Sequence, residues 1–137
     1  FYAVYPPGHP LAELPEIRWA DLARYPLITL QGQFTKGLST DLRYQVSGLD
    51  FGSSTVVNYM TTAFSMVAAG LGVTVCIPYA ASLVRLYQFE MRPVVAPTIP
   101  RSFYVFTRDR RALSPAAQRF HDELFRYIEQ HPDFQTN

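Results

Sequence analysis

The chain has 137 residues, with 12 lysines and arginines against 11 aspartates and glutamates and a formal net charge of +1. Apolar residues make up 48% and aromatic residues 15%, which excludes a disordered chain and predicts one domain with a sizeable core. Positive and negative charges nearly balance, so the chain does not have the excess of positive charge that is typical of a nucleic-acid-binding module. A single cysteine excludes a disulfide framework and any metal site built from several thiolates.

The N-terminus begins directly on an apolar run, Phe1–Tyr5, which predicts a buried strand. No methionine and no charged segment precede this run, so it does not have the pattern of a signal peptide. We therefore expect the chain to be a fragment of a longer protein. The polar residues at its other end, 135–137, are typical of a tail or loop.

Strand and helix patterns alternate in the first part of the chain. The prolines and glycine at 6–10 end the first strand in a turn, and a short helix is predicted at 19–23. A strand at 27–30 and a polar loop at 31–35 follow. Leu38, Leu42 and Val46 then recur at the spacing of one helix face, with Gly48 suited to the C-cap.

A long uncharged segment runs from Phe51 to Val84 and is long enough to cross a bilayer. Its serines, threonines, glycines and proline divide it into shorter pieces, so we predict core elements rather than a membrane span. These are a strand at 53–57, a helix from Asn58 as candidate N-cap to about Ala69, and a strand at 73–77. Gly70 is expected to end the helix.

The remaining elements are a short helix at 79–85, strands at 86–92 and 102–107, and a last helix. That helix is expected to run from Pro115 to about Gln130 with Ser114 as its N-cap. The alternation of strands and helices predicts an α/β sheet with parallel pairs and right-handed crossovers.

Two strand-to-helix junctions are the candidate binding positions, because ligands in such sheets lie beyond the carboxyl ends of strands. The junctions are residues 29–35 and 58–59, and each offers backbone N–H groups and the positive end of a helix. Their neutral donors are Gln31, Gln33, Thr35 and Asn58, and their flat apolar faces are Phe34 and Tyr59. This set suits a small organic anion or polar metabolite. Alternatively, Asn58 and Thr35 only cap helices and Phe34 only packs.

The sequence gives little indication of a catalytic or metal-binding motif. The three histidines, His9, His121 and His131, lie far apart in the sequence and do not form a metal-ligand motif. Cys76 lies in an apolar strand and is interpreted as a packed thiol. Ser114 lacks the Gly-x-Ser-x-Gly pattern of a nucleophile elbow. We therefore predict no catalytic residues, no metal site, no cofactor and no enzyme activity.

Several short motifs occur in a definite order along the chain. They are His9–Ala12, Asp21–Ala23 with Tyr25–Ile28, Val67–Val73 with Pro78, Pro97–Arg101, and Leu113–Ala117 with Phe120. The most specific is the Val-Ala-Ala-Gly-Leu-Gly-Val run before Pro78. In this order, and over essentially the whole chain, the sequence resembles the effector-binding domain of LysR-type transcriptional regulators.

The resemblance implies an α/β fold of the type II periplasmic-binding-protein kind, with one complete subdomain and part of a second. Residues 11–102 would form the second subdomain. Residues 1–10 and 103–137 would supply crossover strands and the C-terminal part of the first. In the family, a small effector binds between the subdomains, and an N-terminal helix-turn-helix, absent from this chain, binds DNA.

The resemblance also implies the effector contacts of the second subdomain. They map to Thr29, Gln31, Gln33, Phe34, Thr35, Asn58, Tyr59, Pro78 and Tyr79. The predicted function is a cytoplasmic sensor of a small organic effector, with a carboxylate as the expected chemistry. The expected assembly is a homo-dimer or tetramer that contacts DNA only through the missing domain and contacts no membrane. The alternative is an extracytoplasmic solute-binding protein of the same fold.

Overall fold

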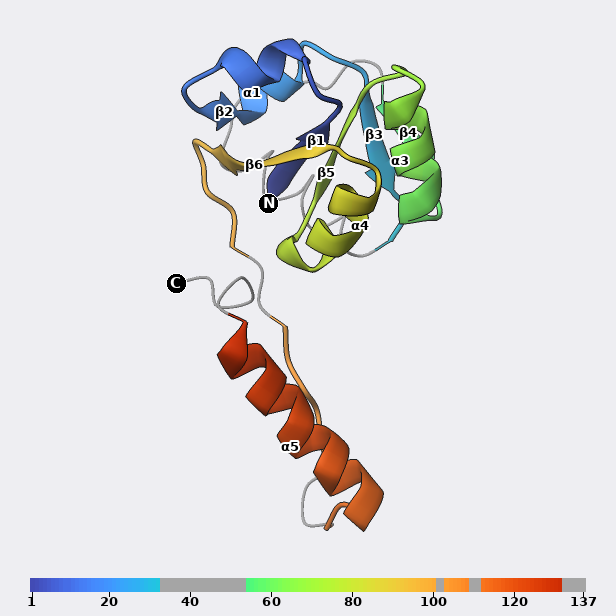
Figure 1. Ribbon diagram of the computed structural model, residues 1–137, viewed down its shortest axis with the longest axis vertical. Helices are drawn as coiled ribbons and strands as arrows, with labels where there is room; N and C mark the ends of the chain where they lie inside the picture. Colours follow the sequence, from blue (N-terminus) through green and yellow to red (C-terminus); the bar gives the residue numbers. More distant parts are fainter. Residues whose placement is uncertain (33–53, 101–102, 109–111, 132–137) are drawn as a thin grey trace. The chain divides into compact units, whose positions relative to one another are not determined.

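The structure, a computed structural model, describes residues 1–32, 54–100, 103–108 and 112–131. The chain divides into two units, Phe1–Ile99 and Pro100–Asn137. The first unit holds a six-stranded sheet, and the second holds one long helix, α5 (Figure 1). The helix predicted around Leu38, Leu42 and Val46, with its cap at Gly48, lies outside the described residues.

The strands and helices follow the order expected from the sequence in most places. The strands are β1 (Tyr2–Tyr5), β2 (Ile17–Arg18), β3 (Leu27–Leu30), β4 (Ser54–Val57), β5 (Val73–Cys76) and β6 (Glu90–Val95). The helices are η1 (Pro10–Glu13), α1 (Trp19–Leu22), α3 (Met60–Ala68), η2 (Pro78–Ala80), α4 (Ala81–Leu86) and α5 (Pro115–Gln130). The uncharged segment 51–84 is thus divided as predicted, and no helix among the described residues is long and apolar enough to cross a membrane.

The sheet is mixed, in the order β2-β6-β1-β5-β3-β4. Strand β3 is parallel to both of its neighbours, β4 and β5, and β2 is parallel to β6. These pairs confirm the predicted parallel pairing. Strand β1 is antiparallel to β5 and to β6, which the sequence analysis did not predict. The division into subdomains at residues 11 and 102 stays a prediction.

Side chains of the central strands alternate between two cores, one on each face of the sheet. On one face, Ala3 and Tyr5 of β1 pack with Leu11 and Trp19 from η1 and α1. On the other face, Val4 packs with residues of α3 and α4, among them Phe64, Val67 and Val84. The sheet is therefore covered on both faces, as in other α/β domains.

Two helices end in the same hydrogen-bond pattern, in which a residue with positive φ follows the C-cap. After α3, Gly70 has a φ of 73°, and the Leu71 N–H donates to the carbonyl of Met66. This confirms Gly70 as the residue that ends the helix. After α4, Gln88 takes the same role with a φ of 57°, and the Phe89 N–H donates to the carbonyl of Val84.

The turn at Gln88 corrects one prediction. The strand expected at 86–92 is β6, Glu90–Val95, because α4 extends to Leu86 and its terminal turn occupies the next residues. The strand expected at 102–107 is also wrong for the residues described there. Within the part of the chain that the structure describes, residues 103–108 pair with no strand, and the side chains of Phe103, Tyr104, Val105 and Phe106 are exposed.

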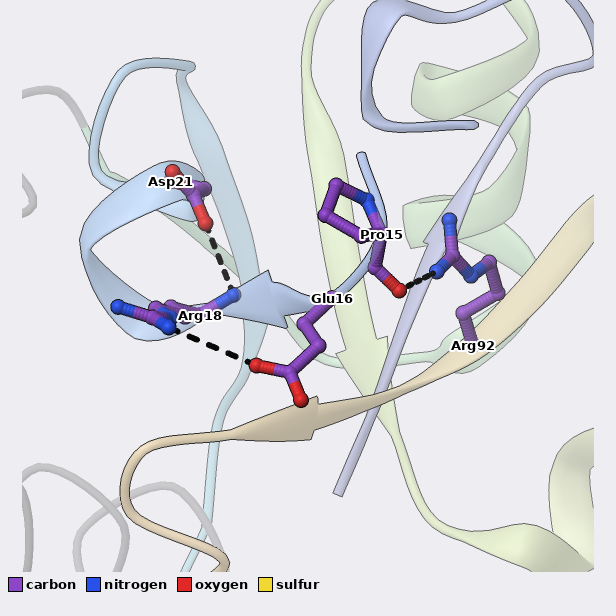
Figure 2. A network of polar contacts seen from close by, with 5 residues as sticks. All are labelled: Pro15, Glu16, Arg18, Asp21 and Arg92. Carbon is purple, nitrogen blue, oxygen red and sulfur yellow. Dashed lines mark hydrogen bonds and ion pairs between the residues drawn. The ribbon is translucent and has the colours of Figure 1, made fainter. Parts of the chain in front are cut away.

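Arg92 of β6 fastens the segment around η1 to the sheet. Its guanidinium donates hydrogen bonds to the carbonyl oxygens of Leu11, Ala12 and Leu14 and to that of Pro15, at 2.8–3.3 Å. Figure 2 shows Arg92 reaching Pro15, while Arg18 pairs with Glu16 at the surface. The five donors of a guanidinium allow one side chain to serve several carbonyls at once.

The second unit consists of α5 and its flanking segments. Ser114 caps the helix as predicted, because its hydroxyl accepts a hydrogen bond from the Ala117 N–H at 3.3 Å. All of α5 is described, and none of its residues is buried. The ring of Phe120, on the apolar side of the helix, is 69% exposed.

Candidate binding site at the carboxyl edge of the sheet

The parallel strands β4, β3 and β5 end at the same edge of the sheet, which we call the carboxyl edge. Leu30 at the end of β3 lies opposite Val57 at the end of β4. The next N–H, that of Gln31, donates to the carbonyl of Val57 at 2.7 Å. The two junctions selected from the sequence, after Leu30 and after Val57, are therefore adjacent.

Strand β5 brings a third segment to this edge. It pairs with β3 with Leu27 opposite Val73, so Pro78 and Tyr79 follow β5 on the side where Gln31 follows β3. The structure thus places Gln31, Asn58, Tyr59, Pro78 and Tyr79 along one edge. Thr29 lies within β3 and is half-buried. The other predicted positions, Gln33, Phe34 and Thr35, lie outside the described residues.

The side chains at the carboxyl edge are accessible. Tyr59 is 70% exposed and Tyr79 is 57% exposed, and Gln31 and Asn58 are exposed as well. Pro78 is half-buried and begins η2. Amide and phenol groups in these positions can donate hydrogen bonds to a ligand, and the phenol rings offer apolar faces.

Helix α3 begins at this edge with its first turn uncapped by a side chain. The predicted N-cap, Asn58, is wrong by one residue, because Tyr59 holds the N-cap position in an extended conformation. A phenol cannot reach back to the first turn as an asparagine does, and no side-chain cap bond is formed. Among the described residues, no side chain caps the first turn, whose N–H groups can donate to water or to an anion.

The described residues that follow β3, β4 and β5 at the carboxyl edge carry no charged side chains. Residues 25–35 and 51–84 contain no Asp, Glu, Lys or Arg. In the described part of the first unit, all charged residues lie within 13–24 and 85–92. Among the described residues, the groups that the edge offers are neutral donors, backbone N–H groups and aromatic rings.

The segment after β6 also reaches the carboxyl edge, which sequence analysis missed. Strand β6 is antiparallel to β1, as β5 is, so β6 and β5 run in the same direction. The indole N–H of Trp19 donates to the carbonyl of Pro97 at 2.9 Å and holds this segment in place. Nothing in the local pattern of residues 96–98 indicated this position, because it depends on strand pairing.

The described residues near the edge include the single cysteine of the chain. Cys76, the last residue of β5, is buried, and burial raises the pKa of its thiol to about 12, which confirms a packed rather than nucleophilic cysteine. Within the described residues, no group of three or more His, Cys, Asp and Glu side chains could hold a metal ion.

Comparison with known protein families shows which family this chain belongs to. The family described as the LysR substrate binding domain matches residues 1–128. The chain belongs to this family. Its six-stranded mixed sheet agrees with the predicted fold class, and the description of the family as a substrate binding domain agrees with the predicted ligand-binding role in a LysR-type regulator.

Two curated relatives of this LysR domain are HTH-type transcriptional regulators of Escherichia coli K12. The chain is 27% identical to YbhD over 118 residues, which covers 82% of the chain and 35% of YbhD. It is 27% identical to YnfL over 127 residues, which covers 89% of the chain and 41% of YnfL. Both relatives are named as uncharacterized, and the chain spans only about two-fifths of their length or less.

A solved structure shares the fold. The effector binding domain of QuiR, in complex with shikimate, superimposes with a TM-score of 0.70 at 22% sequence identity. The match covers 95% of this chain and 61% of the QuiR chain. At this identity the likeness establishes the LysR domain fold.

Proposed function

We propose that this LysR domain binds a small organic effector at the carboxyl edge and serves as the sensing part of a transcriptional regulator. One observation carries the proposal. The Gln31 N–H bonds to the Val57 carbonyl at 2.7 Å, so the ends of β3 and β4 present Gln31, Asn58 and Tyr59 side by side. Strand ends that meet beside a helix start are where open α/β sheets bind ligands.

The proposed effector is a small carboxylate. Neutral donors and the uncapped first turn of α3 favour a single negative charge over a neutral or cationic ligand. The complex of the QuiR domain with shikimate, a hydroxylated ring carboxylate, supports this chemistry for the fold. The same proposal includes contacts to the effector from Thr29, Pro78 and Tyr79 and from Gln33, Phe34 and Thr35.

We place this domain in a cytoplasmic regulator that forms a homo-dimer or tetramer and binds DNA through a helix-turn-helix. The naming of both curated relatives as HTH-type regulators supports this. Effector would change DNA binding only through its difference in affinity between the states of the assembly. The coding sequence upstream of Phe1 tests the point, because an encoded signal peptide in place of a helix-turn-helix would favour a solute-binding protein.

Substitution of Asn58 tests the site itself. Calorimetry on the full-length protein, titrated with shikimate and a panel of related carboxylates, should show that Asn58→Ala weakens binding by about 1 kcal/mol, the loss of one hydrogen bond. Ser82→Ala, an exposed position on α4, is the matched control and should bind as the wild type does. Equal affinity of Asn58→Ala and Ser82→Ala would remove Asn58 from the site.

A further inference from the structure

The two ends of the first unit, Phe1 and Ile99, lie in the same part of its core. Strand β1 is antiparallel to β6, so the start of β1 lies beside the end of β6, where the chain leaves the unit. The Val94 N–H donates to the carbonyl of Phe1 at 2.9 Å and joins the two segments at this point. Residues far apart in the sequence therefore begin and end the first unit side by side.

Trp19 contacts both of these ends. Its side chain is fully buried at the start of α1, and its ring meets the ring of Phe1 edge-on, with centroids 5.8 Å apart and an angle of 72° between the ring planes. At the other end of the unit, its indole N–H donates to the carbonyl of Pro97 at 2.9 Å, and Ile99 packs in the same cluster. An edge-to-face ring pair and an indole hydrogen bond are both directional contacts, so each end depends on the position of the indole.

Strand pairing holds the backbone of Trp19 at this point. Strand β2 is parallel to β6, with Arg18 opposite Val95 in the last pair, so Trp19 leaves its strand where residues 96–99 leave theirs. The Asp21 carboxylate accepts the Arg18 N–H at 3.0 Å and closes the first turn of α1, as Figure 2 shows. The sheet and the turn therefore fix the backbone of Trp19, and its side chain reaches both ends from a fixed base.

We infer that Trp19 is a positioning residue that ties the two ends of the first unit together, so that Phe1 and residues 97–99 open and move as one. Without the indole, each end would be held by its own strand pairing. With the indole, a displacement at one end is passed to the other through a single side chain. In the sensor proposed above, a change at the carboxyl edge would reach both ends of the unit together, and the tie itself needs no effector.

Hydrogen exchange of the 137-residue chain, followed by NMR without a ligand, tests the tie. Each variant removes a contact at one end and is read at the other, with the Val73 N–H, which donates to a carbonyl beside the β3–β5 ladder, as the reference. Trp19→Phe removes the bond to Pro97 and should raise the exchange rate of the Val94 N–H relative to the reference about fivefold, the effect of one lost hydrogen bond. Phe1→Leu removes the ring pair and should raise the relative exchange rate of the Trp19 indole N–H by a similar factor.

Leu22→Val is the matched control, because Leu22 is buried in the same helix and the same cluster. It should raise neither relative rate. If Trp19→Phe or Phe1→Leu leaves the rate read at the opposite end within about twofold of the wild type, the ends open separately and the inference is wrong. If the control raises both relative rates as much as these variants do, Trp19 is only one part of the core and the inference is also wrong.

The wild type gives a second test that does not depend on the folding of a variant. In native-state exchange at increasing urea concentration, the Val94 N–H and the indole N–H of Trp19, the single tryptophan, should share one opening free energy and one urea dependence, below those of the Val73 N–H. Different values would show separate opening, and values equal to those of Val73 would show only global unfolding; either would overturn the tie. Because neither experiment contains a ligand, its failure leaves the proposed function to be decided by the Asn58 variant.

Discussion

At the scale of single residues, one arginine does more for the fold than its place in the sequence suggests. Arg92 donates to four carbonyl groups of the segment that contains η1, and Leu11 of that segment is buried in the core. Hydrogen bonds from a charged donor are worth more than neutral ones. These four hydrogen bonds, which we call the Arg92 clamp, therefore hold the segment with the buried Leu11 against β6. The nearby ion pair of Arg18 and Glu16 is largely exposed.

Replacing the two arginines should separate these roles. Arg92→Met keeps the apolar stem but leaves the four carbonyls without their donor, and we expect it to lower the free energy of unfolding by about 2–3 kcal/mol. Arg18→Met loses only a surface pair whose side chains are both 61% exposed, and should cost under about 1 kcal/mol. Urea unfolding followed by fluorescence measures both values, and equal costs would contradict the clamp.

His9 links pH to the same segment. Its Nδ1 accepts a hydrogen bond from the Leu11 N–H at 3.2 Å and caps η1, and its ring packs between those of Tyr5 and Tyr25. Burial lowers the pKa of His9 from its ordinary 6.5, while the carboxylate of Glu90 opposes the shift. Protonation at Nδ1 would remove the acceptor of the cap.

We expect an acid-side loss of stability from His9. Because its pKa is lower in the folded state, the unfolded chain binds the proton more readily, and stability falls as the pH drops below about 6.5 and through the lower folded pKa. Above that range His9 contributes no pH dependence. His9→Asn keeps an acceptor for the Leu11 N–H but does not titrate, so its unfolding free energy should change less between pH 7.5 and 5.5 than that of the wild type. Parallel pH profiles would show that His9 is not responsible.

At the scale of elements, the turn from α3 into β5 depends on Gly72. This glycine has a φ of 152°, and a Cβ built on it would lie 2.2 Å from the carbonyl oxygen of Pro26. That carbonyl also accepts the Val73 N–H at 3.0 Å, the bond next to the start of the β3–β5 ladder. The close approach of the two backbones explains a glycine at this position of the Gly-Leu-Gly run.

Alanine at Gly72 should be far more costly than alanine at Gly70. Gly72→Ala combines backbone strain with a clash against a backbone atom, and we expect a loss of about 3 kcal/mol or more. Gly70→Ala meets nothing within 4 Å and incurs only the strain of its φ of 73°, about 1 kcal/mol. Denaturant midpoints of the two variants give the comparison, and a similar cost for both would argue against the close approach.

At the scale of the whole molecule, the first unit is stabilised up to Ile99. Ile99 is buried in the core with Trp19, and Trp19 also bonds to the Pro97 carbonyl. The second unit has a different character, because α5 has no buried residue and Phe103, Phe106 and Phe120 are each about 70% exposed or more. Exposed aromatic side chains of this kind are typical of a segment that is covered in a larger assembly.

Truncation should locate this boundary. A chain of residues 1–100 keeps Ile99 and should unfold with the free energy of the full chain, within about 0.5 kcal/mol. A chain that ends at Val95 loses a buried isoleucine and the Trp19 hydrogen bond, and should be less stable by about 3 kcal/mol or more. The fluorescence of Trp19, the single tryptophan, reports both transitions. A large loss on removing only residues 101–137 would place the boundary elsewhere.

Local patterns were sufficient to predict most elements of this protein. The apolar run of β5, the glycine after α3, and the Ser-Pro start of α5 act through neighbours in the sequence, and the structure confirms them. The local pattern did not predict the end of α4 at Gln88. A residue with positive φ is usually a glycine, and here a glutamine has this conformation. The local pattern also failed at Asn58, where the chain enters α3 one residue later.

Pairing between distant segments was decided only by the tertiary structure. A four-residue strand such as β1 has the same apolar pattern whether its neighbours run parallel or antiparallel, so its antiparallel place in the middle of the sheet is not encoded locally. The sequence by itself determined the residue types at the two candidate junctions and the family resemblance. Only the packing of β4, β3 and β5 could bring those junctions to one edge, because strand order depends on hydrogen bonds and burial between residues far apart in the chain.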